Sequence, residues 1–309
     1  CRAAPGLLHD GADDPGQHSS QNEQDSRNWT RFGKVPMLEP ADSEECKEFT
    51  KIAFEVSERF DTPVLLRSET RVSHCDSPVE LGERKESPVQ KGLDKKETPK
   101  YVMVPMYARV KRVAIEERIS KLSTYADSDF PFNTIEINNP SIGFITSGVS
   151  YLYTKEVFPE YSFLKLGMVY PLPKEMIKSF ASQVEKLYVV EELDPFIEDY
   201  VKALGIPCTG KDIIPICLEL TPEIVDQALN GKQHPGKYPK YDTNPVPPRP
   251  GIRISAWDGM TFFSASTSRI GDRDYLIRHE CPEYTAVCPV TGCWAGRKWS
   301  WERSSPASH

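Results

Sequence analysis

The sequence lacks the long apolar run, the basic surplus and the clustered cysteines that mark several classes of protein. No stretch approaches the roughly 20 apolar residues that a membrane-spanning helix needs, and the first residues do not resemble a signal peptide. A net charge of -7 offers no basic surface for nucleic acid or an anionic membrane. The eight cysteines are scattered through 309 residues, which favours reduced thiols. We therefore expect a soluble, cytoplasmic protein that binds neither nucleic acid nor membrane.

A glycine-rich phosphate loop is also missing. Ser147-Gly148-Val149 supplies one glycine where a dinucleotide-binding motif needs three, and Gly210-Lys211-Asp212 lacks the earlier glycine and the hydroxyl of a phosphate loop. Both signals for nucleotide binding are weak. Glu191-Glu192 follows a predicted strand, where α/β sheets place ligand groups. We interpret this pair as a solvated loop pair, with a ligand-binding role as the alternative.

One stretch, residues 12–27, is polar throughout and holds no large apolar side chain. We call it the polar stretch. Asp14-Pro15-Gly16 has turn chemistry, because proline fixes φ and glycine tolerates a positive φ. Ser20 followed by Glu23 matches a capping box, which predicts a helix that begins at Gln21.

That predicted helix start has the chemistry of an anion site. Its free N–H groups would lie beside His18, Ser19 and Ser20, and a helix N-terminus favours negative charge. A carboxylate or a phosphate would suit it. The alternative is a solvated turn that only caps a surface helix, on which Arg27 forms an i,i+4 ion pair with Glu23.

Patterns outside the polar stretch indicate an α/β protein. An apolar stripe at three-four spacing predicts a helix over 42–60, capped by Asp42 or Ser43. Cys46 lies on this stripe, so we interpret it as a buried small hydrophobe rather than a nucleophile. Thr62 to Arg67 then has the pattern of a short buried strand, and a helix followed by a buried strand is typical of α/β folds.

The later chain divides into a linker and a regular repeat. Gly82 to Lys100 is rich in Lys and Glu without apolar periodicity, which predicts a linker, and a helix over 107–125 is expected to pack across two domains. From residue 140, strands and helices alternate with short connections, which predicts a small parallel sheet covered on both faces. The predicted strands are 142–146, 162–166 and 187–190, and the predicted helices are 149–158, 173–184 and 195–204.

A series of motifs follows the polar stretch in a fixed order. They are Pro36 to Pro40, Asp61 to Arg67, Thr70 to His74, Ile145 to Tyr151, Leu166 to Pro173 and Leu187 to Pro195. With the polar stretch, they resemble the large (alpha) subunit of indolepyruvate ferredoxin oxidoreductase, of the 2-oxoacid:ferredoxin oxidoreductase family. The resemblance covers about residues 12 to 250, and so long a series of matches is specific.

The resemblance implies an α/β fold with four parts. Residues 1–81 are the end of a thiamine-diphosphate pyrimidine-type domain, 82–139 a linker and connecting helix, and 140–232 a transketolase C-terminal-like parallel-sheet domain. Residues 233–309 are expected to be a Pro-rich linker and a disordered or frame-shifted tail, because the resemblance stops near Pro250 and three Trp follow within a short span. Cys1 to Gly11 fit neither a strand nor an amphipathic helix, so we expect the true start to lie upstream.

The tail contains possible metal ligands at spacings that match no common site. Its candidates are His279, Cys281, Cys288 and Cys293, whose spacing fits neither a paired-cysteine zinc site nor an iron-sulfur run. We expect no metal there. A frameshift near Gly251 is the expected reason why the family's next domain does not follow.

The function implied by the resemblance is that of an enzyme fragment. The parent would oxidatively decarboxylate aryl 2-oxoacids, with indolepyruvate as type substrate, to aryl-acetyl-CoA while electrons pass to ferredoxin. Implied cofactors are thiamine diphosphate, Mg and 4Fe-4S clusters, and implied partners are a smaller beta subunit, ferredoxin, coenzyme A and the aryl pyruvate. The diphosphate, metal and cluster sites belong to stretches not found in this sequence, so we expect the chain alone to be inactive.

The resemblance also implies which residues face the cofactor and substrate. No catalytic residue is assigned. His18 and the two hydroxyls would hydrogen-bond the reacting group, and Arg27 would meet the substrate carboxylate. Two alternative functions remain, a thiamine-dependent transferase of transketolase type and a non-catalytic module for subunit docking. The pocket residues implied are His18, Ser19, Ser20, Gln21, Asn22, Glu23 and Arg27.

Overall fold

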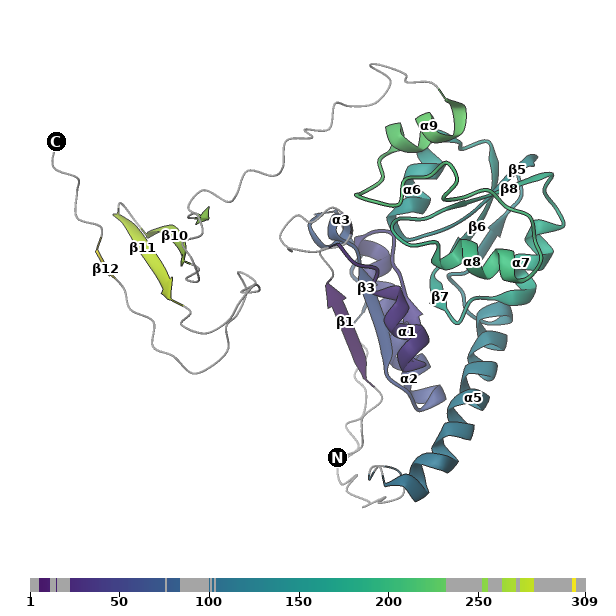
Figure 1. Cartoon of the computed structure of the whole chain (residues 1–309), viewed down its shortest axis with the longest axis horizontal. Helices are drawn as coiled ribbons and strands as arrows, with labels where there is room; N and C mark the ends of the chain where they lie inside the picture. The colour runs from purple at the N-terminus through teal and green to yellow at the C-terminus, as the bar shows by residue number, and fades with distance from the viewer. Residues whose placement is uncertain are drawn as a thin grey trace. The chain divides into compact units, whose positions relative to one another are not determined.

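The structure, a computed structural model, describes residues 6–11, 15, 23–75, 77–83, 100, 102 and 104–231, and the backbone of four strands between 252 and 303. The chain divides into two compact units, and nearly all the described elements belong to the first (Figure 1). Within the described residues, no helix has the length and apolar character needed to cross a membrane. The sheets and helices of the first unit confirm the predicted α/β class.

The first sheet combines four strands that are far apart in sequence. β1 (Leu7–Gly11) and β2 (Met37–Leu38) run parallel to β3 (Val64–Ser68), and β7 (Met168–Tyr170) runs antiparallel to β2. The strand β1 corrects the expectation that residues 1–11 form neither strand nor helix. Its apolar part is only two leucines long, too short for a periodic signal, and its order comes from pairing with β3.

Helix α2 (Ser43–Phe60) confirms the predicted helix, its cap and its buried stripe. The Asp42 side chain accepts a hydrogen bond from the Glu45 N–H at 2.8 Å, which satisfies a free donor of the first turn. Phe49 and its stripe neighbours are buried in one core cluster. Cys46 is half-buried, and burial raises the pKa of its thiol to about 11, which fits the interpretation as a small apolar group.

The helix predicted from Gln21 is wrong in its position. Residues 23–25 are not helical, and α1 runs from Arg27 to Gly33. The Glu23 carboxylate accepts the Leu218 N–H at 3.0 Å, and the Asp25 carboxylate accepts the Arg27 N–H at 3.0 Å. Glu23, which would have completed the capping box, instead binds Leu218, a residue distant in sequence. Asp25 binds the N–H of Arg27, the first residue of α1.

Helix α5 (Pro105–Ser128) confirms the predicted connecting helix and packs on both predicted domains. Leu122 lies in the same core cluster as the α2 stripe. The Asp127 carboxylate accepts the N–H groups of Glu175 and Met176, at 2.9 and 3.0 Å, at the start of α7 (Lys174–Ala181). The predicted linker, 82–100, lies almost wholly outside the described residues.

The second sheet has the strand order β4-β6-β5-β8. β5 (Asn139–Ser147) is parallel to both β6 (Tyr161–Leu166) and β8 (Lys186–Val190), which confirms the three predicted parallel strands. The antiparallel edge strand β4 (Thr134–Glu136) was not predicted, because all three of its residues are exposed and carry no burial pattern. The connecting helices α6 (Gly148–Val157), α7 and α8 (Phe196–Ala203) were predicted, whereas α9 (Pro222–Asn230) was not.

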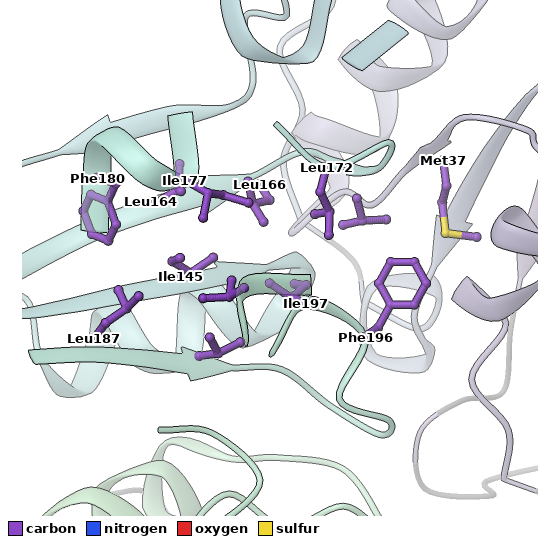
Figure 2. Packing of buried hydrophobic residues seen from close by; sticks show 13 residues of the cluster. Met37, Ile145, Leu164, Leu166, Leu172, Ile177, Phe180, Leu187, Phe196 and Ile197 are labelled. Carbon is purple, nitrogen blue, oxygen red and sulfur yellow. The ribbon is translucent and has the colours of Figure 1, made fainter. Parts of the chain in front are cut away.

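One hydrophobic core joins the two sheets. Met37 of the first sheet belongs to the same buried cluster as Ile145, Leu164 and Phe180 of the second sheet and its helix (Figure 2). Strand β7, which follows the second sheet's β6 in sequence, completes the first sheet. The predicted pyrimidine-type and transketolase-like parts therefore share a sheet and a core within one compact unit.

The second unit contains a small antiparallel sheet with the order β12-β11-β10-β9. Its strands are β9 (Ile252–Ile254), β10 (Phe263–Ile270), β11 (Arg273–Glu280) and β12 (Glu302–Arg303). The expected frameshift is not tested by these backbone strands and stays a prediction. Cys281, Cys288, Cys293 and the side chain of His279 lie outside what the structure describes.

Candidate functional site

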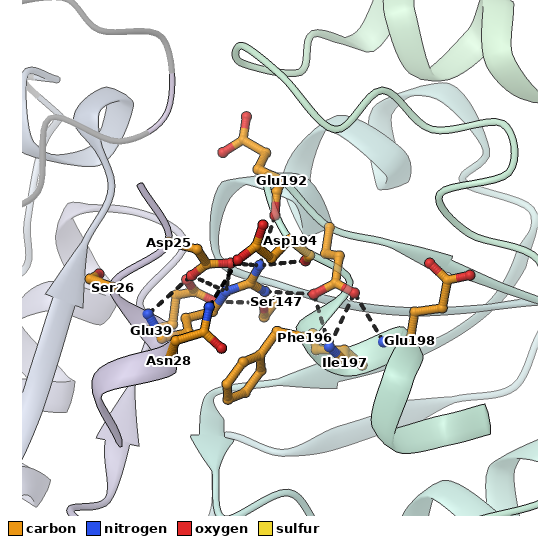
Figure 3. A network of polar contacts seen from close by, with 12 residues as sticks. Asp25, Ser26, Asn28, Glu39, Ser147, Glu192, Asp194, Phe196, Ile197 and Glu198 are labelled. Carbon is orange, nitrogen blue, oxygen red and sulfur yellow. Dashed lines mark hydrogen bonds and ion pairs between the residues drawn. The ribbon is translucent and has the colours of Figure 1, made fainter. Parts of the chain in front are cut away.

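Charged and polar residues gather where several strands end in the first unit. Most of them lie at or just after the ends of β2, β3, β5 and β8, and Lys211 lies in the loop after α8. They meet the end of the polar stretch at the start of α1 (Figure 3). We call this set the polar network. Its members are Asp25, Ser26, Arg27, Glu39, Arg67, Glu69, Ser147, Glu191, Glu192 and Lys211.

Arg27 is the best-paired cation of the polar network. Its guanidinium is 2% exposed, and it binds the Asp25 carboxylate at 2.5–3.0 Å and Glu191 Oε2 at 2.6 Å. Its Nη2 also donates to the backbone carbonyls of Glu192 and Asp194, at 2.7 and 3.1 Å. Every guanidinium nitrogen therefore has an acceptor, as a buried charge requires.

These contacts bear on two predictions for Arg27. Its ion pairs go to Asp25 and Glu191, and α1 begins only at Arg27, so the i,i+4 pair with Glu23 does not form. The proposed contact with a substrate carboxylate is not tested and stays a prediction. It would have to replace one of the carboxylates that Arg27 already binds.

The interpretation of Glu191-Glu192 as a solvated pair is wrong. Glu191 is 1% exposed, and its carboxylate accepts the N–H groups of Ile197 and Glu198, at 3.0 and 2.9 Å, in the first turn of α8. Free N–H groups at a helix start are good partners for a buried carboxylate. Burial nevertheless raises the pKa of Glu191, an effect that the Arg27 charge opposes.

Arg67 forms a second centre in the polar network. Its Nη1 donates to the carboxylates of Glu39 and Glu69, the latter at 3.0 Å, and its Nε donates to Ser26 Oγ at 3.1 Å. The other Glu39 oxygen accepts the Ser147 hydroxyl. Arg67 Nη2 is buried and has no hydrogen-bond partner among the residues described. This centre ties β3, β5, the loop after β2 and the polar stretch together.

Glu69 and Glu192 are two buried carboxyls at the ends of β3 and β8. Glu69 Oε2 accepts the Val149 N–H at 3.0 Å, and Glu192 Oε1 accepts the Leu220 N–H at 2.7 Å. Glu192 Oε2 is buried without a partner in the described part of the chain. Burial raises the pKa of both carboxyls, and for Glu192 the charge of Glu69 raises it further.

Gly148 makes room for one of these carboxyls. Its φ is +51°, and a Cβ placed there would lie 2.7 Å from Glu69 Oε2. Only glycine accepts both the left-handed backbone and so close an approach at low cost. Gly148 is therefore not part of a phosphate loop. Its lack of a side chain leaves room for the Glu69 carboxylate next to the start of α6.

Of the predicted pocket residues, Glu23 and Arg27 are described, and both contact the second sheet's loops. The other five, His18, Ser19, Ser20, Gln21 and Asn22, lie outside the described residues. Sequence reasoning missed Asp25, Glu39, Arg67 and Glu69. A usable signal was present, since Glu39 and Arg67 each directly follow apolar residues of a short buried strand.

The described residues do not fit the diphosphate or the clusters of the implied cofactors. A diphosphate with its magnesium needs unpaired cations and grouped oxygen ligands, whereas both network guanidiniums bind carboxylates. Within the same residues no three His, Cys, Asp or Glu side chains are placed to hold a metal ion. The described thiols, Cys46, Cys75, Cys208 and Cys217, are free and belong to no such group.

No family model matches the chain. Curated relatives named indolepyruvate oxidoreductase subunit IorA do match it. The one from Thermococcus kodakarensis is 38% identical over 287 residues, covering 85% of this chain and 44% of the relative. The one from Archaeoglobus fulgidus is 39% identical over 199 residues, covering 63% and 32%, and the one from Methanothermobacter marburgensis is 38% identical over 240 residues, covering 73% and 38%. The chain thus spans less than half the length of these relatives.

A solved structure shares the fold. It is a 2-oxoglutarate:ferredoxin oxidoreductase from Magnetococcus marinus with 2-oxoglutarate, coenzyme A and succinyl-CoA bound. The TM-score is 0.52 at 15% identity, over 73% of this chain and 48% of that one. At this identity the likeness concerns the fold alone.

Proposed function

We propose that this chain is a segment of an enzyme that oxidatively decarboxylates aryl 2-oxoacids. The premise is that the chain is homologous to part of indolepyruvate oxidoreductase subunit IorA. The observation that carries this proposal is 38% identity over 287 residues to a curated relative of that name. Indolepyruvate is the substrate that the relatives' name gives. The fold is also that of a 2-oxoglutarate:ferredoxin oxidoreductase, although that likeness concerns the fold alone.

The proposed reaction has a simple balance. The bond between the carboxylate and the carbonyl carbon breaks, carbon dioxide leaves, and the electron pair left behind passes in single-electron steps to oxidised ferredoxin. The aryl-acetyl group forms a thioester with coenzyme A, whose thiol loses its proton. Thiamine diphosphate supplies the electron sink for such a decarboxylation. Segments other than the described residues would hold thiamine diphosphate, Mg and the 4Fe-4S clusters, and a smaller beta subunit would complete the enzyme.

The described residues would serve this enzyme by positioning. Arg27 holds the end of the polar stretch against the loops after β8, through Glu191 and two carbonyls. Glu23 adds a second anchor on the Leu218 N–H. We propose that the polar stretch anchored in this way lines the substrate pocket of the complete enzyme. The hydroxyl and imidazole groups of 18–20 would then hydrogen-bond the reacting group.

A chimera tests the proposal. This segment replaces the matching part of the Thermococcus kodakarensis relative, and indolepyruvate-dependent viologen reduction is measured without oxygen, with thiamine diphosphate, magnesium and coenzyme A. We expect activity from the chimera assembled with its partner subunit, and none from this chain alone. The unmodified relative is the positive control.

The same chimera separates the alternatives. Thiamine diphosphate binding with transfer of a two-carbon unit but no viologen reduction would indicate a transketolase-like transferase. Assembly with the partner subunit but no thiamine diphosphate binding would indicate a docking module. Either result would overturn the oxidoreductase proposal. Activity from the chain alone would overturn the assignment of the cofactor sites to other segments.

A further inference from the structure

The polar network holds more acids than bases. With all groups ionised, its acids would exceed its cations by two, in a largely buried part of the fold. Uncompensated buried charge is costly enough that a group usually takes up or releases a proton instead. The acids are Asp25, Glu39, Glu69, Glu191 and Glu192, and the bases are Arg27, Arg67 and Lys211.

The surplus falls at Glu69 and Glu192. Glu191 and Asp25 bind Arg27 directly, and Glu39 binds Arg67 and the Ser147 hydroxyl. Glu69 shares Arg67 with Glu39, and Glu192 has no ion pair in the described part of the chain. Glu192 Oε2 is also the one carboxylate oxygen of the described residues that is buried without a hydrogen-bond partner.

We propose that Glu69 and Glu192 hold one proton between them, and that this shared proton is a pH-sensitive latch joining the end of β3 to the end of β8. Glu192 Oε2, which receives no hydrogen bond from a donor among the described residues, carries the proton and donates it to the neighbouring Glu69 carboxyl. The latch goes beyond the proposed enzyme function and does not depend on it. Its two ends belong to the two sheets, so losing the proton weakens the attachment of one sheet to the other.

Two buried carboxyls whose side chains interact, as those of Glu69 and Glu192 do, cannot both ionise at low cost, and such a pair takes up its protons as a unit. Burial raises the pKa of Glu192 well above its ordinary value, and the charge and hydrogen bond of Glu69 add to the rise. Burial likewise raises the pKa of Glu69, against the opposing charge of Arg67. Both effects favour a pair that keeps one proton above the ordinary pKa of glutamate.

The charged groups around the pair offer no compensation for a second negative charge. Arg67 is shared with Glu39, Arg71 is half exposed and paired with Glu219, and Lys211 Nζ donates to backbone carbonyls. Burial and the charge of Glu192 raise the pKa of the Tyr153 hydroxyl, so it stays neutral. The groups that face the pair from neighbouring elements are Glu39, Arg67, Arg71, Tyr153, Glu191, Lys211 and Glu219.

The sign of the pH effect follows from the raised pKa. A carboxyl with a higher pKa in the folded state binds more protons there, so its contribution to stability is fully present below the unfolded pKa. The contribution is lost as the pH rises from the ordinary pKa of glutamate through the raised value. The urea midpoint of the full chain should therefore fall as the pH rises from about 5 to about 8.

Glu192→Gln tests the latch, because an amide is neutral at every pH and can still donate to Glu69. We expect this variant to lose at least half of the fall in urea midpoint between these pH values. Glu198→Gln is the matched control, since Glu198 is equally buried, lies in the loop-to-helix region after the same strand and pairs with Lys202. The control should keep the wild-type fall, whatever its overall stability.

Infrared spectroscopy of the unmutated full chain provides a second measurement that needs no variant to fold. A protonated-carboxyl carbonyl band should persist at neutral pH, when ordinary glutamates are ionised, and should disappear as the pH is raised further. Absence of that band at neutral pH would overturn the proposal. An unchanged pH dependence in Glu192→Gln, or a dependence lost equally in Glu198→Gln, would overturn it as well.

Discussion

The two buried arginines of the polar network each bind two carboxylates, but they differ in how completely their guanidinium nitrogens are hydrogen-bonded. Arg27 has an acceptor for each guanidinium nitrogen, and its two carboxylates belong mainly to it. Arg67 divides one nitrogen between Glu39 and Glu69 and leaves another nitrogen without a partner in the described region. Each arginine thus faces two carboxylates, but the Arg67 centre also has a nitrogen without a partner and lies within electrostatic reach of Glu192, which has no ion pair among the described residues.

This difference predicts opposite pH responses. At the Arg27 centre the pKa of Asp25 is lowered: burial raises it, but the charge and hydrogen bonds of Arg27 more than offset that rise. At the Arg67 centre the pKa of Glu69 is raised by burial and by nearby acids. The contribution of Asp25 should therefore be lost in acid, whereas those of Glu69 and of Glu191, whose pKa burial also raises, should be lost in alkali. Carboxyls of the polar network can thus determine how the unfolding free energy falls both at low pH and at high pH.

Removing the Arg27 charge should have the largest effect. Arg27→Met keeps the length of the side chain but leaves Asp25 and Glu191 buried without their cation, so we expect a loss of about 3–5 kcal/mol in unfolding free energy. Urea denaturation measures it. Arg71→Met is the control, because its pair with Glu219 is half exposed and contributes about 0–1 kcal/mol. Equal losses in the two variants would contradict the description of Arg27 as a buried anchor.

The next largest effect should come from Gly148 at the Arg67 centre. Gly148→Ala would force a Cβ to 2.7 Å from Glu69 Oε2 at a φ of +51°, which should cost about 2–4 kcal/mol from the backbone and the displaced carboxylate together. Thermal unfolding measures the loss.

Gly205→Ala separates these two terms. Its φ is +78°, but nothing lies within 4 Å of the added Cβ, so only the backbone cost of about 1–2 kcal/mol should remain. Equal losses of unfolding free energy in the two alanine variants would show that the close approach of Glu69 to Gly148 does not contribute to the cost.

A smaller effect, of about 1.5–3 kcal/mol, is expected for Asp25→Asn, because the amide can still accept from Arg27. Its signature is the pH profile. The stability from Asp25 is present above its ordinary pKa of 3.8 and is lost as the pH falls through the lowered value, so the variant should show a flatter acid side. The fall on the alkaline side should remain, because Glu69 and Glu192 are unchanged. Loss of that alkaline fall would mean that Asp25 sets the titration of Glu69 and Glu192 as well.

Elements with strong local patterns were predictable from the sequence. The apolar stripe and cap of α2 gave its position within one residue, and three parallel strands of the second sheet lie where their apolar runs placed them. The strands β1, β2 and β4 were missed or misjudged. Each of them is short, and β4 is exposed throughout, so their order depends on partner strands rather than on local pattern.

The polar network was harder to predict, because its contacts join residues far apart in sequence. Arg27 meets Glu191 across 164 residues of sequence, and Glu39 meets Ser147 across 108. Sequence reasoning placed Glu191-Glu192 at the correct edge of the sheet but expected solvation there. The partners that bury these carboxyls, α8 and the end of the polar stretch, cannot be read from the residues beside them.

The smallest effect is expected from the N-cap of α2. It tests whether the pH dependence of the Arg27 and Arg67 centres is independent of that helix. Asp42→Ala removes the side chain that accepts the Glu45 N–H at the start of α2, so we expect a loss of about 1 kcal/mol at every pH. Asp42→Asn keeps an acceptor at the cap and should lose much less. Urea midpoints across the pH range measure both variants. Because Asp42 belongs to neither centre, its loss should lower the whole profile without changing its slope on either side. A changed slope would show that the first turn of α2 helps to set the charge balance around Glu39, three residues before the cap.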